Sequence, residues 1–148
     1  MSKRFSNLVN RVGIVLSLVV TVVIVVSSLS PSDGMGALPS WIPYADKGAH
    51  ALAYAGFGFC VFLAIGSSKR TASSQRNGYR CLARTLLVFV LGVCLGLSLE
   101  LIQPAFARSM EFLDLVADMI GVVLGILCAL LFFALSAKIG KEVDDGAV

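Results

Sequence analysis

Long apolar runs alternate with short polar stretches along this chain, and four of the runs are long enough to cross a membrane as helices. A helix of about 20 residues spans the hydrocarbon layer, which is roughly 30 Å thick. The predicted spans are residues 12–29, 48–66, 85–102 and 112–137. Short connections join them, so consecutive helices should run in opposite directions. The pattern predicts an all-α fold, an antiparallel four-helix transmembrane bundle formed by a single domain, residues 1–148.

Composition supports a membrane protein over a soluble one. Hydrophobic residues make up 57% of the chain and charged residues 14%, and the mean hydropathy is +0.90. A soluble domain of this length cannot hide so much apolar surface in one core. The basic start followed by an apolar run also fits an export signal, but this run is longer than the ~7–15 residues usual for such a signal. We therefore interpret the first run as a span.

The distribution of lysine and arginine predicts the orientation. Ten of the twelve lie on one side of the predicted membrane, namely Lys3, Arg4, Arg11, Lys69, Arg70, Arg76, Arg80, Arg84, Lys138 and Lys141. Basic residues are enriched in cytoplasmic loops, so both termini should be cytoplasmic. This rule and attraction to the anionic lipids of the inner leaflet are enough to explain the basic stretch at 67–84, so no nucleic-acid binding is needed to account for it. Only Lys47 and Arg108 lie in the opposite connections.

Three polar groups interrupt the apolar pattern, and all three fall at span ends on the predicted outer side. Their members are Asp46, Lys47 and His50; Glu100 and Gln103; and Arg108, Glu111, Asp114 and Asp118. On insertion scales a charge at the centre of a membrane helix costs about 2.5–3.5 kcal/mol. A chain otherwise poor in charge that keeps so many ionisable groups is expected to use them. The sequence therefore predicts a site that opens outward.

Small residues predict how the spans pack. Gly92 and Gly96 continue the polar stripe of the third span, and Gly121 and Gly125 continue that of the fourth. Glycines spaced by four let helices approach closely in lipid, so we expect these two stripes to face each other. The second span offers a small face of Ala49, Ala53 and Gly56. The first span carries no charged residue and should be the most lipid-exposed helix.

The residue types predict roles in the site. His50 titrates near neutral pH, and with Glu100 and Asp114 it forms the predicted acid–base, or catalytic, group. The predicted substrate-binding residues are Asp46, Lys47, Gln103, Arg108 and Asp118. Lys47 and Arg108 are suited to a phosphate or carboxylate of the ligand, with Arg108 able to bind in a bidentate manner.

Other interpretations of the same residues stay open. Five carboxylates face two fixed positive charges, an excess that favours a cation, yet one histidine and scattered carboxylates match no metal motif. We therefore predict no metal or other cofactor, with a divalent metal as the weaker alternative. In a structural interpretation, Arg108 and Lys47 neutralise Asp114 and Glu100 and only fix helix packing. Transport is disfavoured because the polar groups stop near one surface and no internal repeat is present.

Three motifs resemble the VanZ-like membrane protein family. They are D-K-x-x-H-x-x-x-Y at Asp46–Tyr54, E-x-x-Q at Glu100–Gln103, and R-x-x-x-x-x-D-x-x-x-[ND]-x-x-G at Arg108–Gly121. The resemblance covers roughly residues 44–128. Where the family usually has Asn, this chain has Asp118, which adds an ionisable carboxyl one turn deeper than Asp114.

The resemblance implies a multi-pass protein of the bacterial inner (cytoplasmic) membrane. The family's namesake is linked to low-level resistance to teicoplanin, a lipid-tailed glycopeptide that acts on cell-wall precursors outside the membrane. We therefore expect the site to bind or modify an envelope lipid headgroup or a lipid-linked cell-wall component and to affect teicoplanin-type sensitivity. Expected partners are membrane lipids and such a lipid-linked or lipoglycopeptide ligand, with no nucleic acid. Whether catalysis occurs, and in which oligomeric state, is left open.

Overall fold

The computed structural model describes residues 3–30, 44–65, 74–106 and 109–145. They form four helices, α1 (Lys3–Leu29), α2 (Ala45–Ala64), α3 (Ser74–Ile102) and α4 (Phe112–Asp145), and one short 3-10 helix, η1 (Gln103–Phe106). No strand occurs in these ranges. All four α-helices are long and apolar enough to cross a membrane. The predicted all-α fold and the four membrane spans are confirmed.

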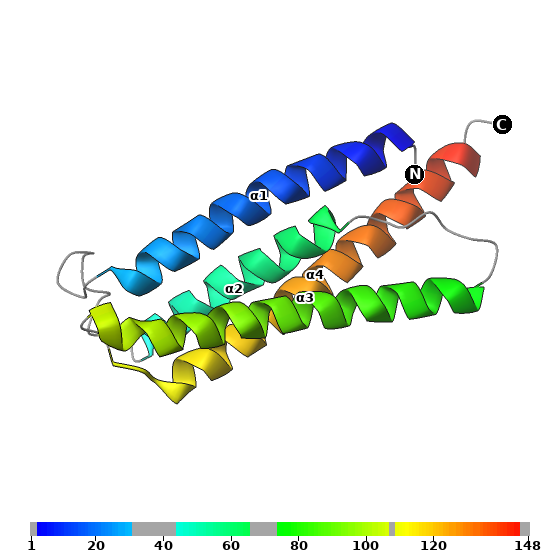
Figure 1. The fold of residues 1–148 in the computed structure, drawn as a ribbon. Helices are drawn as coiled ribbons and strands as arrows, with labels where there is room; N and C mark the ends of the chain where they lie inside the picture. The colour runs from blue at the N-terminus through cyan, green and yellow to red at the C-terminus, as the bar shows by residue number, and fades with distance from the viewer. Residues whose placement is uncertain (1–2, 31–43, 66–73, 107–108, 146–148) are drawn as a thin grey trace.

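Helix α2 is the centre of the bundle. It packs most extensively against α4 and next against α1, while α3 packs mainly on α4. Consecutive helices run in opposite directions, so the end of α1, the start of α2, the end of α3 and the start of α4 lie together, at the left of Figure 1. We call this end, where the polar residues of α2, α3 and α4 are found, the polar end.

The helices are longer than the predicted spans. Helix α1 begins at Lys3 instead of residue 12, α3 begins at Ser74 instead of residue 85, and α4 continues to Asp145 instead of residue 137. The 34 residues of α4 extend over about 50 Å, well beyond the ~30 Å of hydrocarbon. Hydropathy detects only the part that lies in lipid, whereas the polar flanks contain good helix formers and no proline. Helix α2 is shifted instead, from 48–66 to Ala45–Ala64, which brings Asp46 and Lys47 into its first turn.

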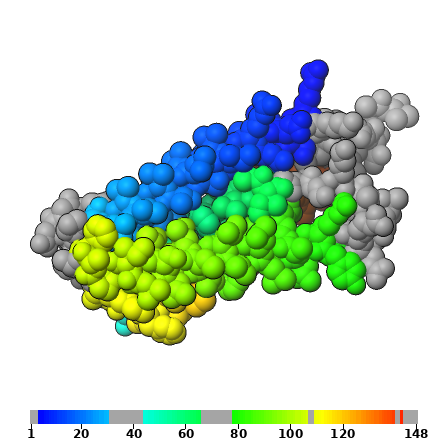
Figure 2. Space-filling model, in the orientation of Figure 1, coloured from blue at the N-terminus to red at the C-terminus, as the bar shows by residue number. Residues whose placement is uncertain are grey.

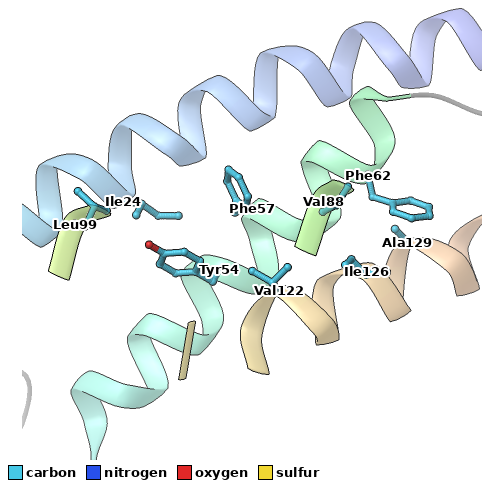
Figure 3. Close-up of a cluster of buried hydrophobic side chains, with 9 residues drawn as sticks. All are labelled: Ile24, Tyr54, Phe57, Phe62, Val88, Leu99, Val122, Ile126 and Ala129. Atoms are coloured by element: carbon cyan, nitrogen blue, oxygen red, sulfur yellow. The ribbon is translucent and has the colours of Figure 1, made fainter. Parts of the chain in front are cut away.

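A cluster of buried apolar side chains joins the helices (Figure 3). Its members are Ile24, Tyr54, Phe57, Phe62, Val88, Leu99, Val122, Ile126 and Ala129. Helix α1 contributes only Ile24 to it, and many of its apolar side chains are more than half exposed, among them Leu18 at 64% and Val15 at 60%. Figure 2 shows α1 and α3 covering one face of the molecule, with α2 visible between them. The predicted lipid exposure of α1 is consistent with this arrangement.

The closest helix approach joins α4 to α2, where the predicted pairing of glycine stripes was partly wrong. A Cβ atom on Gly121 would overlap the backbone of Ala51, and one on Gly125 would overlap the backbone of Ala55. The two glycines of α4 thus face α2, although we predicted that they face α3. The glycines of α3 do face α4 as predicted, because a Cβ on Gly92 would meet the side chain of Val122.

The small face predicted for α2 packs in part. Ala53 lies against the apolar cluster and Gly56 lies near Val20 of α1, whereas Ala49 is exposed. The small residues of α2 that meet α4 are Ala51, Ala55 and Gly58. A Cβ atom on Gly58 would lie 2.7 Å from the carbonyl oxygen of Val122. Spacings of four and three residues place these small residues on one face of the helix. The α2–α4 contact matters most for function because both helices carry the central residues of the polar end.

Candidate functional site

The polar end contains every predicted site residue that the structure describes. They come from the first two turns of α2, the end of α3 with η1, and the start of α4: Asp46, Lys47, His50, Glu100, Gln103, Asp114 and Asp118. Arg108 lies outside the described residues.

Lys47 forms the first part of the site. Its Nζ atom lies 2.8 Å from Asp46 Oδ2, 2.5 Å from Glu111 Oε2 and 2.5 Å from Asp114 Oδ1. These three carboxylates belong to α2, to the residue just before α4, and to the first turn of α4. One ammonium group therefore ties the start of α2 to the start of α4. Lys47 thus contacts Asp114, for which the structural interpretation expected Arg108 as the partner.

Exposure falls from the rim of this cluster towards its interior. The side chains of Asp46 and Glu111 are 53% and 48% exposed, that of Lys47 is 16% exposed, and that of Asp114 is 7% exposed. Two carboxylates thus face the surroundings, while the third is buried beneath the ammonium group. A ligand that approaches this end meets the two rim carboxylates first.

His50 and Asp118 form the second, deeper part. His50 Nδ1 lies 2.9 Å from Asp118 Oδ1, a hydrogen bond that crosses from α2 to α4. The Tyr54 hydroxyl also hydrogen-bonds the Asp118 carboxylate. Figure 3 shows the Tyr54 ring within the apolar cluster, with its hydroxyl directed away from Val122. Asp118 and Tyr54 are both almost fully buried, so this carboxylate is held from two sides.

Gly96 of α3 makes room for this arrangement. A Cβ atom at Gly96 would lie 2.8 Å from Asp118 Oδ2 and 3.4 Å from the Tyr54 hydroxyl. The glycine predicted as a packing residue therefore forms a wall of the site, because any side chain there would displace the Asp118 carboxylate.

The two parts meet at His50. Its Nε2 atom lies 3.9 Å from Asp114 Oδ2, the carboxylate whose other oxygen contacts Lys47. The imidazole side chain is 15% exposed. Its two nitrogens are therefore placed between a buried carboxylate on one side and the lysine cluster on the other. A histidine held in this way is suited to accept or donate a proton.

Glu100 holds the connection between α3 and α4. Its buried Oε2 accepts a hydrogen bond of 3.0 Å from the backbone N–H of Glu111. The Glu111 side chain in turn contacts Lys47, so the same residue links α3, α4 and α2. Gln103, the first residue of η1, follows Glu100 in the chain and is also buried. The structural interpretation expected a lysine or arginine beside Glu100, but among the described residues the Glu100 carboxylate bonds this backbone amide.

Two residues of the site were underrated by sequence reasoning. Glu111 was counted among the carboxylates without a role, and Tyr54 was named only as the last residue of a motif. The spacing of Asp46, His50 and Tyr54 by four placed the tyrosine on the polar stripe and was the signal for it. For Glu111 no local signal was available, because its contacts with Lys47 and Glu100 join residues far apart in the chain.

Three carboxylates of the site have the spacing of a metal site. Oxygen atoms of Asp46, Glu111 and Asp114 lie within 4.8 Å of one another. Oxygen ligands suit divalent cations. The Lys47 ammonium group, however, lies against all three carboxylates, so a metal ion would have to displace it. The arrangement as it stands is that of a bound ammonium group.

Comparisons with known proteins place this chain in a family. A search of curated proteins and a search of solved structures found no match. The profile of the VanZ/LLP1 family matches residues 2–133, nearly the whole chain and all three motifs that form the polar end. With its four apolar helices, the protein is a multi-pass membrane protein that belongs to the VanZ/LLP1 family.

Proposed function

We propose that the polar end binds, and through His50 modifies, the headgroup of an envelope lipid or of a lipid-linked cell-wall component. It would do so at the outer face of the bacterial inner membrane, with both termini of the protein in the cytoplasm. The single observation that supports this best is the partly buried hydrogen bond between His50 and Asp118, which joins two helices beneath a half-exposed rim of carboxylates.

Asp118 acts in this proposal as a positioning residue. A carboxylate that accepts the Nδ1 proton of a neutral histidine fixes the ring and leaves Nε2 free to act as a base. In this protein Nε2 then faces Asp114, 3.9 Å away, and the lysine cluster. When the ring is protonated, the same two carboxylates stabilise its charge. The family motif that this chain resembles usually has Asn at this position, so a stronger proton acceptor on His50 would be a particular property of this chain.

The placement at the outer face rests on the lysine and arginine count. The predicted topology has ten of the twelve basic residues on the cytoplasmic side and the polar residues of the site on the other. A site at the end of a lipid-facing bundle is open to a headgroup that arrives from the outer leaflet. Teicoplanin-type agents act on components of the same compartment, so a change in such a component would alter sensitivity to them.

The experiment compares cells that lack the protein with cells that express native protein, His50→Ala, Asp118→Ala or the control Gly48→Ala. Gly48 lies on the same helix, and a Cβ there meets nothing within 4 Å. Mass spectrometry of envelope lipids and teicoplanin sensitivity are measured at matched membrane levels of the variants. We expect native protein and Gly48→Ala to change the lipid profile or the sensitivity and both site variants to lose the effect. Full activity of His50→Ala would refute the proposal.

A structural role is the second candidate, and one observation favours it. The Lys47 ammonium group is already surrounded by three carboxylates, and Glu100 is occupied by a backbone amide, so much of the cluster is satisfied internally. Buried ion pairs can be replaced by apolar residues without loss of stability. In this case Lys47→Met combined with Asp114→Leu would keep both the fold and the cellular effect. The proposed function predicts that the fold survives and the effect is lost.

A further inference from the structure

We propose that the headgroup recognised at the polar end carries a primary ammonium group, as an aminophospholipid does, and that Lys47 occupies the position of this group in the unliganded protein. The inference rests on the proposed function and names the ligand class for that site.

The first argument is the geometry around Lys47. A primary ammonium group has three N–H donors and no acceptor. In this structure such a group lies within 2.8 Å of oxygens from three different carboxylates, those of Asp46, Glu111 and Asp114. Three acceptors from separate segments converge on one –NH₃⁺ group. A quaternary ammonium group, which has no N–H donor, could not hydrogen-bond to them.

The second argument is charge. The described part of the polar end contains five carboxylates, Asp46, Glu100, Glu111, Asp114 and Asp118, with Lys47 as its fixed positive charge. An anion that approached the Lys47 ammonium group would meet the two rim carboxylates at short range. Like charges at such distances repel strongly where water is partly excluded. The predicted use of Lys47 for a phosphate is therefore disfavoured while its own carboxylates surround it.

The third argument is exchange. Replacing the Lys47 ammonium group by that of a ligand leaves the charge of the carboxylate cluster unchanged, so no carboxylate is left uncompensated. Lys47 has a flexible four-carbon side chain and lies directly beside the half-exposed Asp46 of the rim. Once displaced, its ammonium group is free to pair with the phosphate of the same headgroup. A zwitterionic aminophosphate headgroup thus satisfies both Lys47 and the carboxylates that it leaves.

The test measures lipid retention by native mass spectrometry. The full-length protein in detergent is offered phosphatidylethanolamine, phosphatidylcholine and phosphatidylglycerol with identical acyl chains. We expect about tenfold preference for phosphatidylethanolamine over each of the others, the size of effect that loss of one charge-assisted contact produces. Glu111→Gln should remove most of this preference. The matched control is Glu142→Gln, which alters an exposed pair with Lys138 at the opposite end of α4 and should retain it.

A second measurement covers the case in which Glu111→Gln folds poorly. Lys47→Ala leaves the three carboxylates without their ammonium group, so ethylammonium should raise its melting temperature by about 3 °C or more through binding to the folded state. Tetramethylammonium should not, and neither salt should stabilise the native protein in this way. Equal stabilisation by both cations would contradict the inference.

The outcomes separate this inference from the proposed function. If phosphatidylglycerol or phosphatidylcholine is retained as well as phosphatidylethanolamine, and retention still depends on His50 and Asp114, the ammonium inference fails while the proposed headgroup site stands. If retention of no lipid depends on these residues, both fail. Preference for phosphatidylethanolamine that disappears in Glu111→Gln supports both.

Discussion

The contact between Gly121 and Ala51 offers a sharp test of how packing controls the site. Gly121 lies one turn beyond Asp118 on α4, and Ala51 follows His50 on α2. The close approach of these two backbones thus sets the distance across which His50 and Asp118 form their hydrogen bond. We predict that Gly121→Ala loosens this bond although the new methyl group touches neither residue.

The expected magnitude follows from the structure. A Cβ atom at Gly121 would lie 3.0 Å from the carbonyl carbon and from the Cα atom of Ala51, whereas ordinary contact begins at 3.4 Å. The carbonyl oxygen of Ala51 is nearer still, so α2 and α4 must part by at least about 0.4 Å at a backbone that cannot rotate away. Overpacking of this kind typically costs about 1–3 kcal/mol. The His50–Asp118 distance of 2.9 Å would then exceed the usual range for a hydrogen bond.

Two measurements check this prediction. His50 is the only histidine of the chain, so the ¹⁵N signals of histidine-labelled protein report on this one ring. In Gly121→Ala we expect the Nδ1 signal to move and the free energy of unfolding in detergent to fall by about 1–3 kcal/mol. Gly48→Ala is the control on α2, because a Cβ there meets no atom within 4 Å. It should leave the ring signals in place and the stability equal or slightly higher.

The reasoning is refuted if Gly121→Ala is as stable as Gly48→Ala and its imidazole signals match those of the native protein. Such a result would mean that α2 and α4 have room that the structure does not show. A loss of stability with unchanged signals would also contradict it, because the helices would then have separated without disturbing the hydrogen bond between them.

Three further predictions concern the charged residues and the orientation. Lys47→Met should lower the free energy of unfolding by about 2 kcal/mol, less than the roughly 3–5 kcal/mol of a fully buried pair, because two of the carboxylates around Lys47 are half exposed. Adding Asp114→Leu should restore the stability to within about 1 kcal/mol of the native protein. Additive losses from the two substitutions would argue against energetic coupling between Lys47 and Asp114. Glu100→Leu should cost about 1.5–3 kcal/mol through loss of a charge-assisted bond to a backbone amide, and Glu100→Gln, which keeps an acceptor, clearly less, as measured by chemical unfolding in detergent. In cysteine-free protein, Ser109→Cys should react with an impermeant thiol reagent added outside the cell and Gly78→Cys should not; the reverse labelling would place the polar end in the cytoplasm.

Much of this protein follows from its sequence because lipid restricts what a chain can do. Apolar runs of sufficient length must become helices that satisfy their own backbone hydrogen bonds, so the four spans could be located from hydropathy alone. Charged side chains avoid the hydrocarbon, so the polar residues had to lie near span ends. With antiparallel helices, the end of α3 and the starts of α2 and α4 then meet at one end. Most members of the candidate site were predictable on these grounds without any knowledge of distances, whereas the roles of Glu111 and Tyr54 were not.

The partners within the site were decided by tertiary structure. Hydropathy and spacing show which residues share a face of a helix, but not which neighbouring helix that face meets. Here α2 lies at the centre and brings Ala51 and Ala55 against the glycines of α4, so these glycines do not serve the α3 contact that spacing alone suggested. The rotation set by this contact places His50 against Asp118 and Lys47 among three carboxylates. Such pairings depend on helix rotation and separation to within a few tenths of an ångström, and those quantities arise only when all four helices pack together.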